Sequence, residues 1–261
     1  MEGLLKRYIA LKNETTLWFH LICRRLGMSR YEIQHVVLPE QDLIYIPIAK
    51  NACTSILYAL YEIEYNRVYD NAKLKQFGYK YVHDFYKKRS EAYTSVEKLK
   101  ATDKLVFTVI RDPVKRFISC YRNRVVDLKD LEETKDLLEQ KGLPLEPDIN
   151  TFALRLQEYR NVNKVIEHHS RPQSHSLGNT LSYVDKIFFL DNFEEIKEFL
   201  KRFKPGLKLR QAKTGGSFFS LSDLSPEALE KIITFYSEDY RLLSEFYSPE
   251  KIRTEYENSL G

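Results

Sequence analysis

The sequence predicts a three-layer αβα fold, in which helices cover both faces of a central, mainly parallel sheet. Three apolar runs carry this prediction, and each is followed directly by a helical pattern of apolar residues. They are Leu43–Ile48, Leu105–Ile110 and Lys186–Leu190. Strands that alternate with helices along a chain are typical of βαβ units, whose strands pair in parallel.

A single domain accounts for the chain, because 261 residues suffice to bury a large core. No repeat or low-complexity linker divides the sequence, so we predict one domain over residues 1–261, with a helical lead-in over about residues 1–30. The formal net charge of +4 suits an enzyme that binds an anionic ligand. No block of like charge resembles a nucleic-acid arm, so we expect no nucleic-acid partner.

The cysteine count favours a reducing compartment. Cys23, Cys53 and Cys120 are odd in number and lack the spacing of a metal site, which argues against a disulfide framework. The apolar run Leu17–Cys23 is far too short to span a membrane, so we expect no transmembrane segment. A basic cluster at Lys87–Arg89 leaves peripheral contact with anionic lipid open, although a solvated surface is the simpler explanation.

The first strand leads into a candidate anion site. Small and polar residues at Ala49–Cys53 interrupt the apolar run, and a helical pattern begins at Thr54. A helix N-terminus presents unpaired N–H groups and a positive dipole end to an anion. Lys50 adds a full charge, and Ser55 adds a hydroxyl donor beside that of Thr54. The segment therefore predicts a phosphate or sulfate cradle, although an ordinary strand-to-helix turn explains it about as well.

This cradle is not a Walker A loop. That motif requires Gly-x-x-x-x-Gly-Lys-Ser/Thr, and no glycine lies between Leu43 and Tyr61. Small side chains stand where the motif has glycines.

The second strand leads into a similar arrangement. Asp112 is a good N-cap, and Pro113 suits the first position of a helix. Arg111 lies at the strand's end, and one face of the following helix carries Arg116, Ser119 and Asn123. A guanidinium near a serine hydroxyl suits a second phosphate. The alternative is a simple Arg111–Asp112 pair that fixes the helix start.

The third strand precedes a helix predicted over Phe193–Phe203, with Asp191 and Asn192 as its capping residues. Further along the chain, Ser225 and the proline after it predict the start of the last long helix.

Together, the two anion segments resemble the sulfotransferase family that uses 3'-phosphoadenosine-5'-phosphosulfate (PAPS). The first resembles the loop for the 5'-phosphosulfate, and Arg111–Tyr121 resembles the element for the 3'-phosphate. His169–Ser174 and Tyr236–Tyr240 are similar to two segments of the Golgi-type carbohydrate sulfotransferase branch. The matches follow the family's order over about Leu43–Leu243. One departure is Ala49, where the family usually has proline before the lysine.

The resemblance implies a P-loop-like nucleotide-binding fold and sulfuryl transfer from PAPS to a hydroxyl, with a carbohydrate as the leading acceptor and no metal. Lys50 would counter the charge that develops on the departing phosphate. A late loop of the family often covers the 3'-phosphate. The residues implied to contact the donor are Lys50, Asn51, Ala52, Cys53, Thr54, Ser55, Arg111, Ser119, Arg210, Lys213 and Ser217.

A catalytic base is expected between the two donor elements. Family members place a His or Glu there, which points to His83, although a histidine packed among aromatic residues would look the same. Asp84 beside it is the alternative base. The nearby rings of Tyr79, Tyr81, Phe85 and Tyr86 suit a sugar face, though core packing is the commoner use of such residues.

A polar segment near position 170 is expected to touch the acceptor or the donor. The resemblance implies contacts from His169, Arg171 and Gln173. Its histidines could suggest zinc, but Pro172 breaks the helical spacing that would bring them together, so no metal is expected.

Two other functions remain open from sequence. A nucleotide-dependent kinase of P-loop-like fold would need magnesium and an acidic ligand, for which Asp191 is the one candidate. A non-catalytic glycan- or anion-binding module would keep the scaffold without turnover. Vertebrate relatives of the resembled branch are membrane-anchored Golgi proteins, so this chain is expected to be a cytoplasmic, bacterial version or a soluble catalytic domain trimmed of its anchor.

Overall fold

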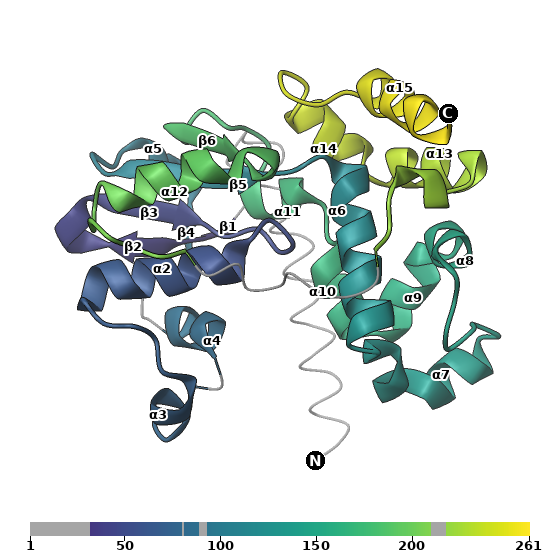
Figure 1. The fold of residues 1–261 in the computed structure, drawn as a ribbon, viewed down its shortest axis with the longest axis horizontal. Coiled ribbons are helices and arrows are strands. Elements are labelled where there is room, and N and C mark those ends of the chain that lie inside the picture. Colours follow the sequence, from purple (N-terminus) through teal and green to yellow (C-terminus); the bar gives the residue numbers. More distant parts are fainter. Residues whose placement is uncertain (1–31, 80, 89–92, 210–217) are drawn as a thin grey trace, which may run out of the picture.

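A computed structural model describes residues 32–79, 81–88, 93–209 and 218–261 (Figure 1). The predicted helical lead-in, Cys23, and the loop residues Arg210, Lys213 and Ser217 lie outside the described residues. Within those described ranges, no helix is both long and apolar enough to cross a bilayer.

The central sheet has four strands in the order β2-β3-β5-β6. β3, β5 and β6 run parallel, and β2 pairs antiparallel with β3 at one edge. The strands are β2 (Val36–Leu38), β3 (Leu43–Ile46), β5 (Leu105–Ile110) and β6 (Lys186–Phe189). A separate two-stranded antiparallel ladder joins β1 (Glu32–Gln34) to β4 (Tyr93–Ser95). The predicted mainly parallel sheet is therefore confirmed.

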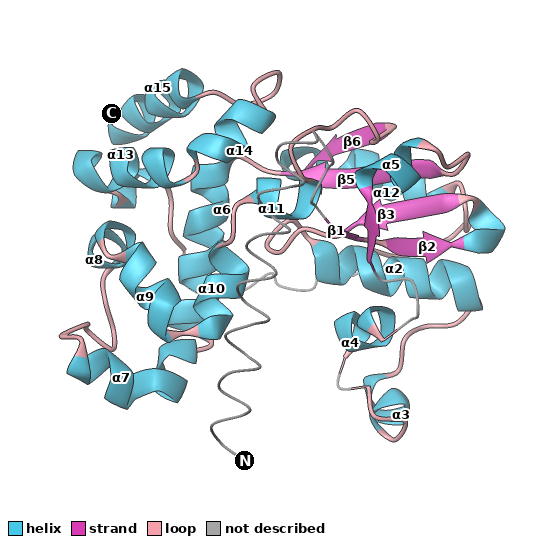
Figure 2. Ribbon diagram, turned by 180° about the vertical axis from the view of Figure 1, so that it is seen from behind, coloured by secondary structure: helices cyan, strands magenta, loops and turns pink. Residues whose placement is uncertain are grey.

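Helices cover both faces of this sheet, as the alternation of buried side chains along β3 requires. Leu43 and Tyr45 pack in one apolar cluster, and Ile44 and Ile46 pack in another on the opposite face. The first cluster is covered by α2 (Cys53–Tyr65), α4 (Val82–Lys87) and α12 (Phe193–Lys201). The second is covered by α5 (Val96–Lys100) and α11 (Gln173–Leu177). The three layers are visible in Figures 1 and 2.

A helical body lies beside the sheet, and the third apolar cluster forms its core (Figure 2). It is centred on α6 (Pro113–Cys120), whose Phe117 is fully buried. The other helices of this body are α7 (Lys135–Gln140), α8 (Ile149–Leu154), α9 (Leu156–Val162), α10 (Lys164–Ser170), α13 (Pro226–Phe235), α14 (Ser237–Leu242) and α15 (Pro249–Leu260). A short α3 (Asn71–Lys75) lies apart, beyond α2.

The predicted helix starts are partly confirmed. Asp112 caps α6, because its carboxylate accepts hydrogen bonds from the N–H groups of Val114 at 2.9 Å and Lys115 at 3.2 Å. Ser225 likewise caps α13 by accepting from Ala228 N–H at 3.2 Å. Asn192 occupies the N-cap position of α12, as predicted, but its side chain makes no bond to the helix backbone and donates to a glutamate instead.

One feature of the α6 region was not predicted. After Cys120 the helix continues as a π-helical segment over Tyr121–Asp127. Such wider turns are rare and occur often at functional sites, because the extra residue per turn changes where side chains point. Here the segment carries three polar residues that line a cavity, namely Arg122, Asn123 and Arg124.

Candidate active site

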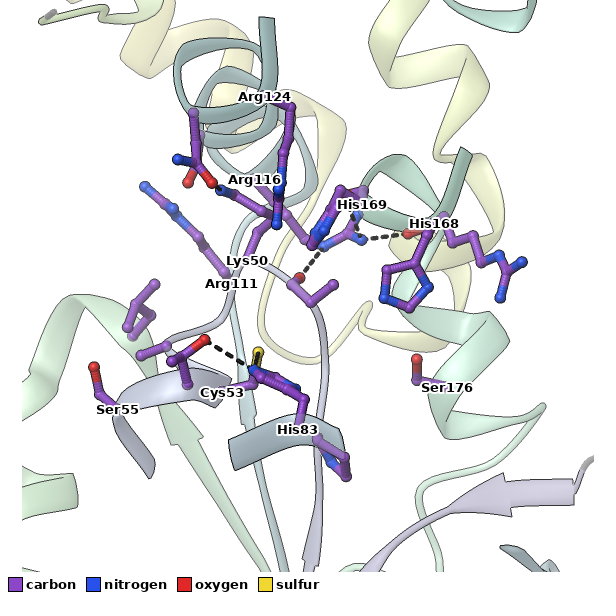
Figure 3. Close-up of a pocket in the computed structure, with 18 of the residues that line it drawn as sticks. Lys50, Cys53, Ser55, His83, Arg111, Arg116, Arg124, His168, His169 and Ser176 are labelled. Atoms are coloured by element: carbon purple, nitrogen blue, oxygen red, sulfur yellow. Dashed lines mark hydrogen bonds between the residues drawn. The ribbon is translucent and has the colours of Figure 1, made fainter. Parts of the chain in front are cut away.

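A cavity of about 890 Å³ lies at the carboxyl ends of the parallel strands (Figure 3). Its lining includes the loop after β3, Arg111 after β5 and Leu190 after β6. In open α/β sheets, ligands bind beyond the carboxyl ends of strands, where loops and helix N-termini converge. The fold thus places this cavity where a ligand site is expected.

The loop after β3 holds a strained conformation without glycine. Lys50 has φ of 71° and Ala52 has φ of 56°, both in the left-handed region that costs a non-glycine residue about 1–2 kcal/mol. Between them, Asn51 is fully buried and anchors the loop. Its amide nitrogen donates to Val109 O at 2.9 Å and to Gln173 Oε1 at 2.7 Å. Asn51 therefore supports the loop from behind and does not line the cavity.

The structure brings Lys50, Thr54 and His83 to the same cavity. Lys50 Nζ donates to Asn123 Oδ1 at 2.8 Å, which holds the ammonium group against the π-helical segment. Thr54 Oγ1 lies 2.9 Å from His83 Nε2, and Cys53 Sγ lies 4.0 Å from the same nitrogen. The predicted base and the predicted cradle are thus in direct contact. Asp84, the alternative base, does not line the cavity.

Cys53 and Ser55 line the cavity although both side chains are largely buried. Burial raises the pKa of the Cys53 thiol, and the nearby Lys50 charge opposes that shift. A raised pKa keeps the sulfur protonated at neutral pH, which argues against a thiolate nucleophile.

Arg111 and Ser119 line the same cavity as Lys50. Burial lowers the pKa of the Arg111 guanidinium, and the charge of Asp191 partly opposes that shift. Arg111 Nε is buried, and no hydrogen-bond partner for it exists among the described residues. A buried donor without a partner is costly, so this atom is suited to a ligand that accepts a hydrogen bond. Lys50 and Arg111 therefore share one cavity, as contact with two ends of a single ligand requires.

Arg116 has a structural role that the sequence did not reveal. It is 1% exposed, and its Nε donates to Ala49 O at 3.0 Å. Its Nη2 donates to the carbonyl oxygens of His169 and Arg171. One guanidinium thereby ties the Lys50 loop to the chain that follows α10.

Gln173, predicted as a ligand contact, is fully buried behind the cavity. Its Nε2 donates to Arg111 O at 2.7 Å, and its Oε1 accepts from Arg111 N–H at 3.2 Å. Asp239 in turn accepts from the N–H groups of Gln173 and Ser174, both at 2.8 Å. Tyr236 donates to Ser170 O at 2.8 Å. The segment Tyr236–Tyr240 therefore supports the segment His169–Ser174, and Gln173 positions Arg111.

His169 and Arg171, the other two predicted contacts, both line the cavity. Burial is the main cause that lowers the pKa of His169, to about 2, with the Arg124 charge next, so its imidazole is neutral. Its Nδ1 is buried without a partner in the described structure. Arg171 is held by a two-point ion pair with Glu167, at 2.7 and 2.6 Å.

Several lining residues were missed by sequence reasoning. The most notable are Arg122 and Arg124 of the π-helical segment, Tyr93 of β4, and the histidines His168 and His175. The sequence has a run of basic residues around Arg122. In an ordinary α-helix, however, the side chains of these residues would point in directions other than the observed ones. Of the predicted aromatic stack, Tyr81 lines the cavity, while Phe85 packs against its aromatic neighbours.

The charge of the lining is strongly one-sided. Among the residues that the structure describes, the lining contains one lysine and five arginines and no aspartate or glutamate. The cations are Lys50, Arg111, Arg116, Arg122, Arg124 and Arg171. In the part of the chain that the structure describes, no group of three or more His, Cys, Asp or Glu side chains could hold a metal ion. The site is built to attract anions.

Comparison with known proteins gives one match. A family model described as "Sulfotransferase family" matches residues 34–247, a range that includes every described residue that lines the cavity. Searches of curated proteins and of solved structures returned no match.

Proposed function

The chain belongs to the sulfotransferase family, and on that premise we propose that it transfers the sulfuryl group of PAPS to a hydroxyl of a carbohydrate. The observation that carries the proposal is that Lys50 and Arg111 line one cavity, each in the loop after a parallel strand. PAPS carries anionic groups at both ends of its ribose, so two separated cations in one groove suit it.

The donor would bind with its 5'-phosphosulfate at the N-terminus of α2 and its 3'-phosphate near Arg111 and Ser119. The first-turn N–H groups of α2 have no carbonyl partner four residues earlier in the helix, which makes them available to a phosphate. Arg111 Nε offers a buried donor without a described partner. Arg210, Lys213 and Ser217 remain predicted contacts to the 3'-phosphate.

The reaction would proceed by attack of the acceptor oxygen on sulfur. A new sulfur–oxygen bond forms while the bond from sulfur to the bridging phosphate oxygen breaks, and 3'-phosphoadenosine-5'-phosphate leaves. Lys50 would stabilise the negative charge that develops on that phosphate. His83 would take the proton of the acceptor hydroxyl, and its contact with Thr54 at 2.9 Å would orient the ring.

A sugar acceptor is favoured by two exposed tyrosines at the cavity. Tyr81 and Tyr93 are 47% and 50% exposed, and both line the cavity. The Tyr81 ring lies 5.2 Å from the His83 ring, and Tyr93 pairs with Gln34 across the β1–β4 ladder. Exposed aromatic rings in a cavity provide flat apolar faces for the C–H side of a sugar ring. His169 and Arg171 would supply polar contacts to the same acceptor, with Gln173 acting behind them through Arg111.

The proposal is tested by ligand-induced stabilisation and by transfer of labelled sulfate. We expect 3'-phosphoadenosine-5'-phosphate to raise the melting temperature, and ATP with magnesium to leave it unchanged. Lys50→Ala should retain its fold and lose at least about 100-fold in transfer rate, the size of effect seen when one stabilising donor is removed.

Stabilisation by ATP and magnesium alone would support the kinase instead. Stabilisation by the bisphosphate without any turnover on a broad panel of glycans would support the anion-binding module. Normal transfer by Lys50→Ala would remove Lys50 from the mechanism.

A further inference from the structure

Phe77 is an apolar side chain that the core does not use. It lies two residues after the end of α3, and it is 73% exposed. Figure 1 shows α3 at the lower edge of the molecule, beyond α4, and Figure 2 shows the same arrangement from behind. A single exposed apolar residue is ordinary on a protein surface, so the surroundings of Phe77 decide whether it has a function.

The turn after α3 holds Phe77 outside. Gly78, at φ of 80°, donates from its N–H to Lys75 O at 3.0 Å. The N–H of Tyr79 donates to Leu74 O at 3.2 Å. This pair of bonds forms a glycine-terminated helix end, in which the residues at the two ends of the turn often make an apolar contact. Leu74 and Tyr79 both pack inward here, against the α2 cluster and against an aromatic ring of α4. The turn is therefore complete without Phe77.

Lysines flank this turn on both sides. Lys73 and Lys75 belong to the last turn of α3, directly before Phe77. Lys88, at the end of α4, donates from Nζ to Gly78 O at 2.8 Å, which brings a third cation to the turn. Lys73 and Lys75 are exposed, and neither pairs with a carboxylate among the residues that the structure describes.

The wider segment around the turn is basic as well. Residues 65–79 and 81–88 contain five lysines and arginines and two aspartates. One of these acids, Asp70, is engaged as the cap of α3, because its carboxylate accepts from the N–H groups of Ala72 at 2.9 Å and Lys73 at 3.1 Å. The protrusion thus combines a positive charge with an exposed aromatic side chain.

A bilayer that contains anionic lipid matches both features. Aromatic rings are favoured at the boundary between headgroups and acyl chains, and lysine side chains extend to the headgroup level. Each lysine close to an anionic bilayer strengthens binding by about 5-fold. A hydrated polyanion such as an acidic glycan would pair with the lysines but would leave the Phe77 ring in water.

We propose that the surface formed by Lys73, Lys75, Phe77 and Lys88 docks this chain on a bilayer of anionic phospholipid, with the Phe77 ring inserted among the headgroups. A few lysines and one ring give a reversible, peripheral association. The same α4 that ends at this surface begins at the cavity, where Tyr81 is part of the lining. The inference does not depend on the proposed function.

Vesicle sedimentation tests the proposal on the full chain, without donor or acceptor. The vesicles are phosphatidylcholine alone and phosphatidylcholine mixed with phosphatidylglycerol. We expect the chain to sediment with the anionic vesicles and to stay in solution with the neutral ones. Added salt should weaken the binding, because it screens the exposed lysines.

Phe77→Ser should weaken partition into the anionic vesicles by about 10-fold, the size expected when one aromatic side chain is withdrawn from an apolar phase. Leu260→Ser is the matched control, because Leu260 is 57% exposed on α15, far from α3 in Figures 1 and 2. Both variants should keep the melting temperature of wild type, since both side chains are exposed.

The double variant Lys73→Gln, Lys75→Gln should weaken partition by about 25-fold, or about 5-fold for each lysine. Its control is Lys197→Gln, Lys201→Gln on α12, because each of these lysines pairs with a glutamate of its own helix. The control pair should bind the anionic vesicles as wild type does.

Equal partition into the two kinds of vesicle, or binding to neither, would overturn the inference and leave the sulfotransferase assay unaffected. Full vesicle binding by both Phe77→Ser and the Lys73, Lys75 double variant would overturn it too, because the contact would then lie elsewhere on the chain. Binding that depends on the lysines but not on Phe77, and that heparin abolishes, would assign the surface to a soluble polyanion in place of a bilayer.

Discussion

The contact between Thr54 and His83 orients the ring of the proposed base. A neutral imidazole has one N–H donor and one acceptor nitrogen. If Nε2 carries the hydrogen and donates to Thr54 Oγ1, 2.9 Å away, the lone pair lies on Nδ1. If Nε2 carries the lone pair instead, the hydroxyl donates to it, so Thr54 orients the ring in either tautomer.

Thr54→Val should therefore lower kcat by about 10-fold or more, because general-base catalysis contributes roughly 10²- to 10⁴-fold and the ring loses its orienting partner. Thr54→Ser should recover most of the activity, since it restores the hydroxyl. The measurement is the pH–rate profile of all three proteins, in which the valine variant should also shift the acidic limb, where the base becomes protonated. Equal profiles would show that Thr54 does not orient His83.

His169 makes stability depend on pH. Its pKa is lowered from 6.5 to about 2, mainly by burial, so the unfolded chain binds a proton below pH 6.5 that the folded chain does not. The free energy of unfolding should therefore decrease as the pH falls below 6.5, by at most about 1.4 kcal/mol per pH unit for this group. The histidines His168 and His175 shift in the same direction.

Urea unfolding of wild type and His169→Gln between pH 7 and pH 5 measures this effect. The glutamine variant should show a smaller loss of stability on acidification. Asp112 acts in the opposite sense, because burial raises its pKa to about 6 and its protonation favours the folded state as the pH falls. That contribution is common to both proteins and cancels in the comparison. Parallel pH curves would contradict the assignment of a neutral, buried His169.

At the level of elements, the cavity depends on contacts between segments far apart in sequence. Gln173 at the start of α11 bonds to both backbone groups of Arg111, 62 residues earlier in the chain. Arg116 on α6 reaches the Lys50 loop across 67 residues. Asp239 on α14 holds the first N–H groups of α11. These contacts fix the position of the Arg111 loop against the loop after β3.

Gln173→Leu should lower the free energy of unfolding by about 2–4 kcal/mol, because it leaves the buried N–H and C=O of Arg111 without their partners. It should also weaken binding of 3'-phosphoadenosine-5'-phosphate, since Arg111 would no longer be held. Gln157→Leu is the control, as Gln157 is exposed and bonds only to neighbours on its own helix. Similar stability of the two variants would remove the positioning role of Gln173.

The same elements show what sequence reveals and what it does not. β3, β5, β6 and the Asp112 cap follow from local apolar runs and from local capping chemistry, so pattern reasoning found them. The π-helical segment has no comparable local signal, and it determines where Arg124 points. The inward orientation of Gln173 results from partners more than 60 residues away. The single-domain assignment and the cytoplasmic location remain predictions.

At the level of the whole molecule, the arrangement of charge is the dominant property. The net charge of the chain is only +4, yet the described part of the cavity lining holds one lysine and five arginines without a carboxylate. Cations gathered in a partly buried space repel one another, and salt screens them less than it screens exposed charges. This repulsion lowers the stability of the folded chain, and a bound anion should offset it.

Inorganic sulfate should stabilise this chain beyond its general effect on proteins, which arises from exclusion of the ion from the surface. The test compares melting temperatures in sulfate and in chloride at equal ionic strength, for wild type and for Arg111→Gln. A ligand at about 100 times its dissociation constant adds roughly 2.7 kcal/mol, so the difference between the salts should be larger in wild type than in the variant. Arg155→Gln serves as the control, because Arg155 lies outside the cavity lining and pairs with Glu158 on the surface. If all three proteins respond equally, sulfate acts through general exclusion alone, and the cavity does not bind inorganic sulfate.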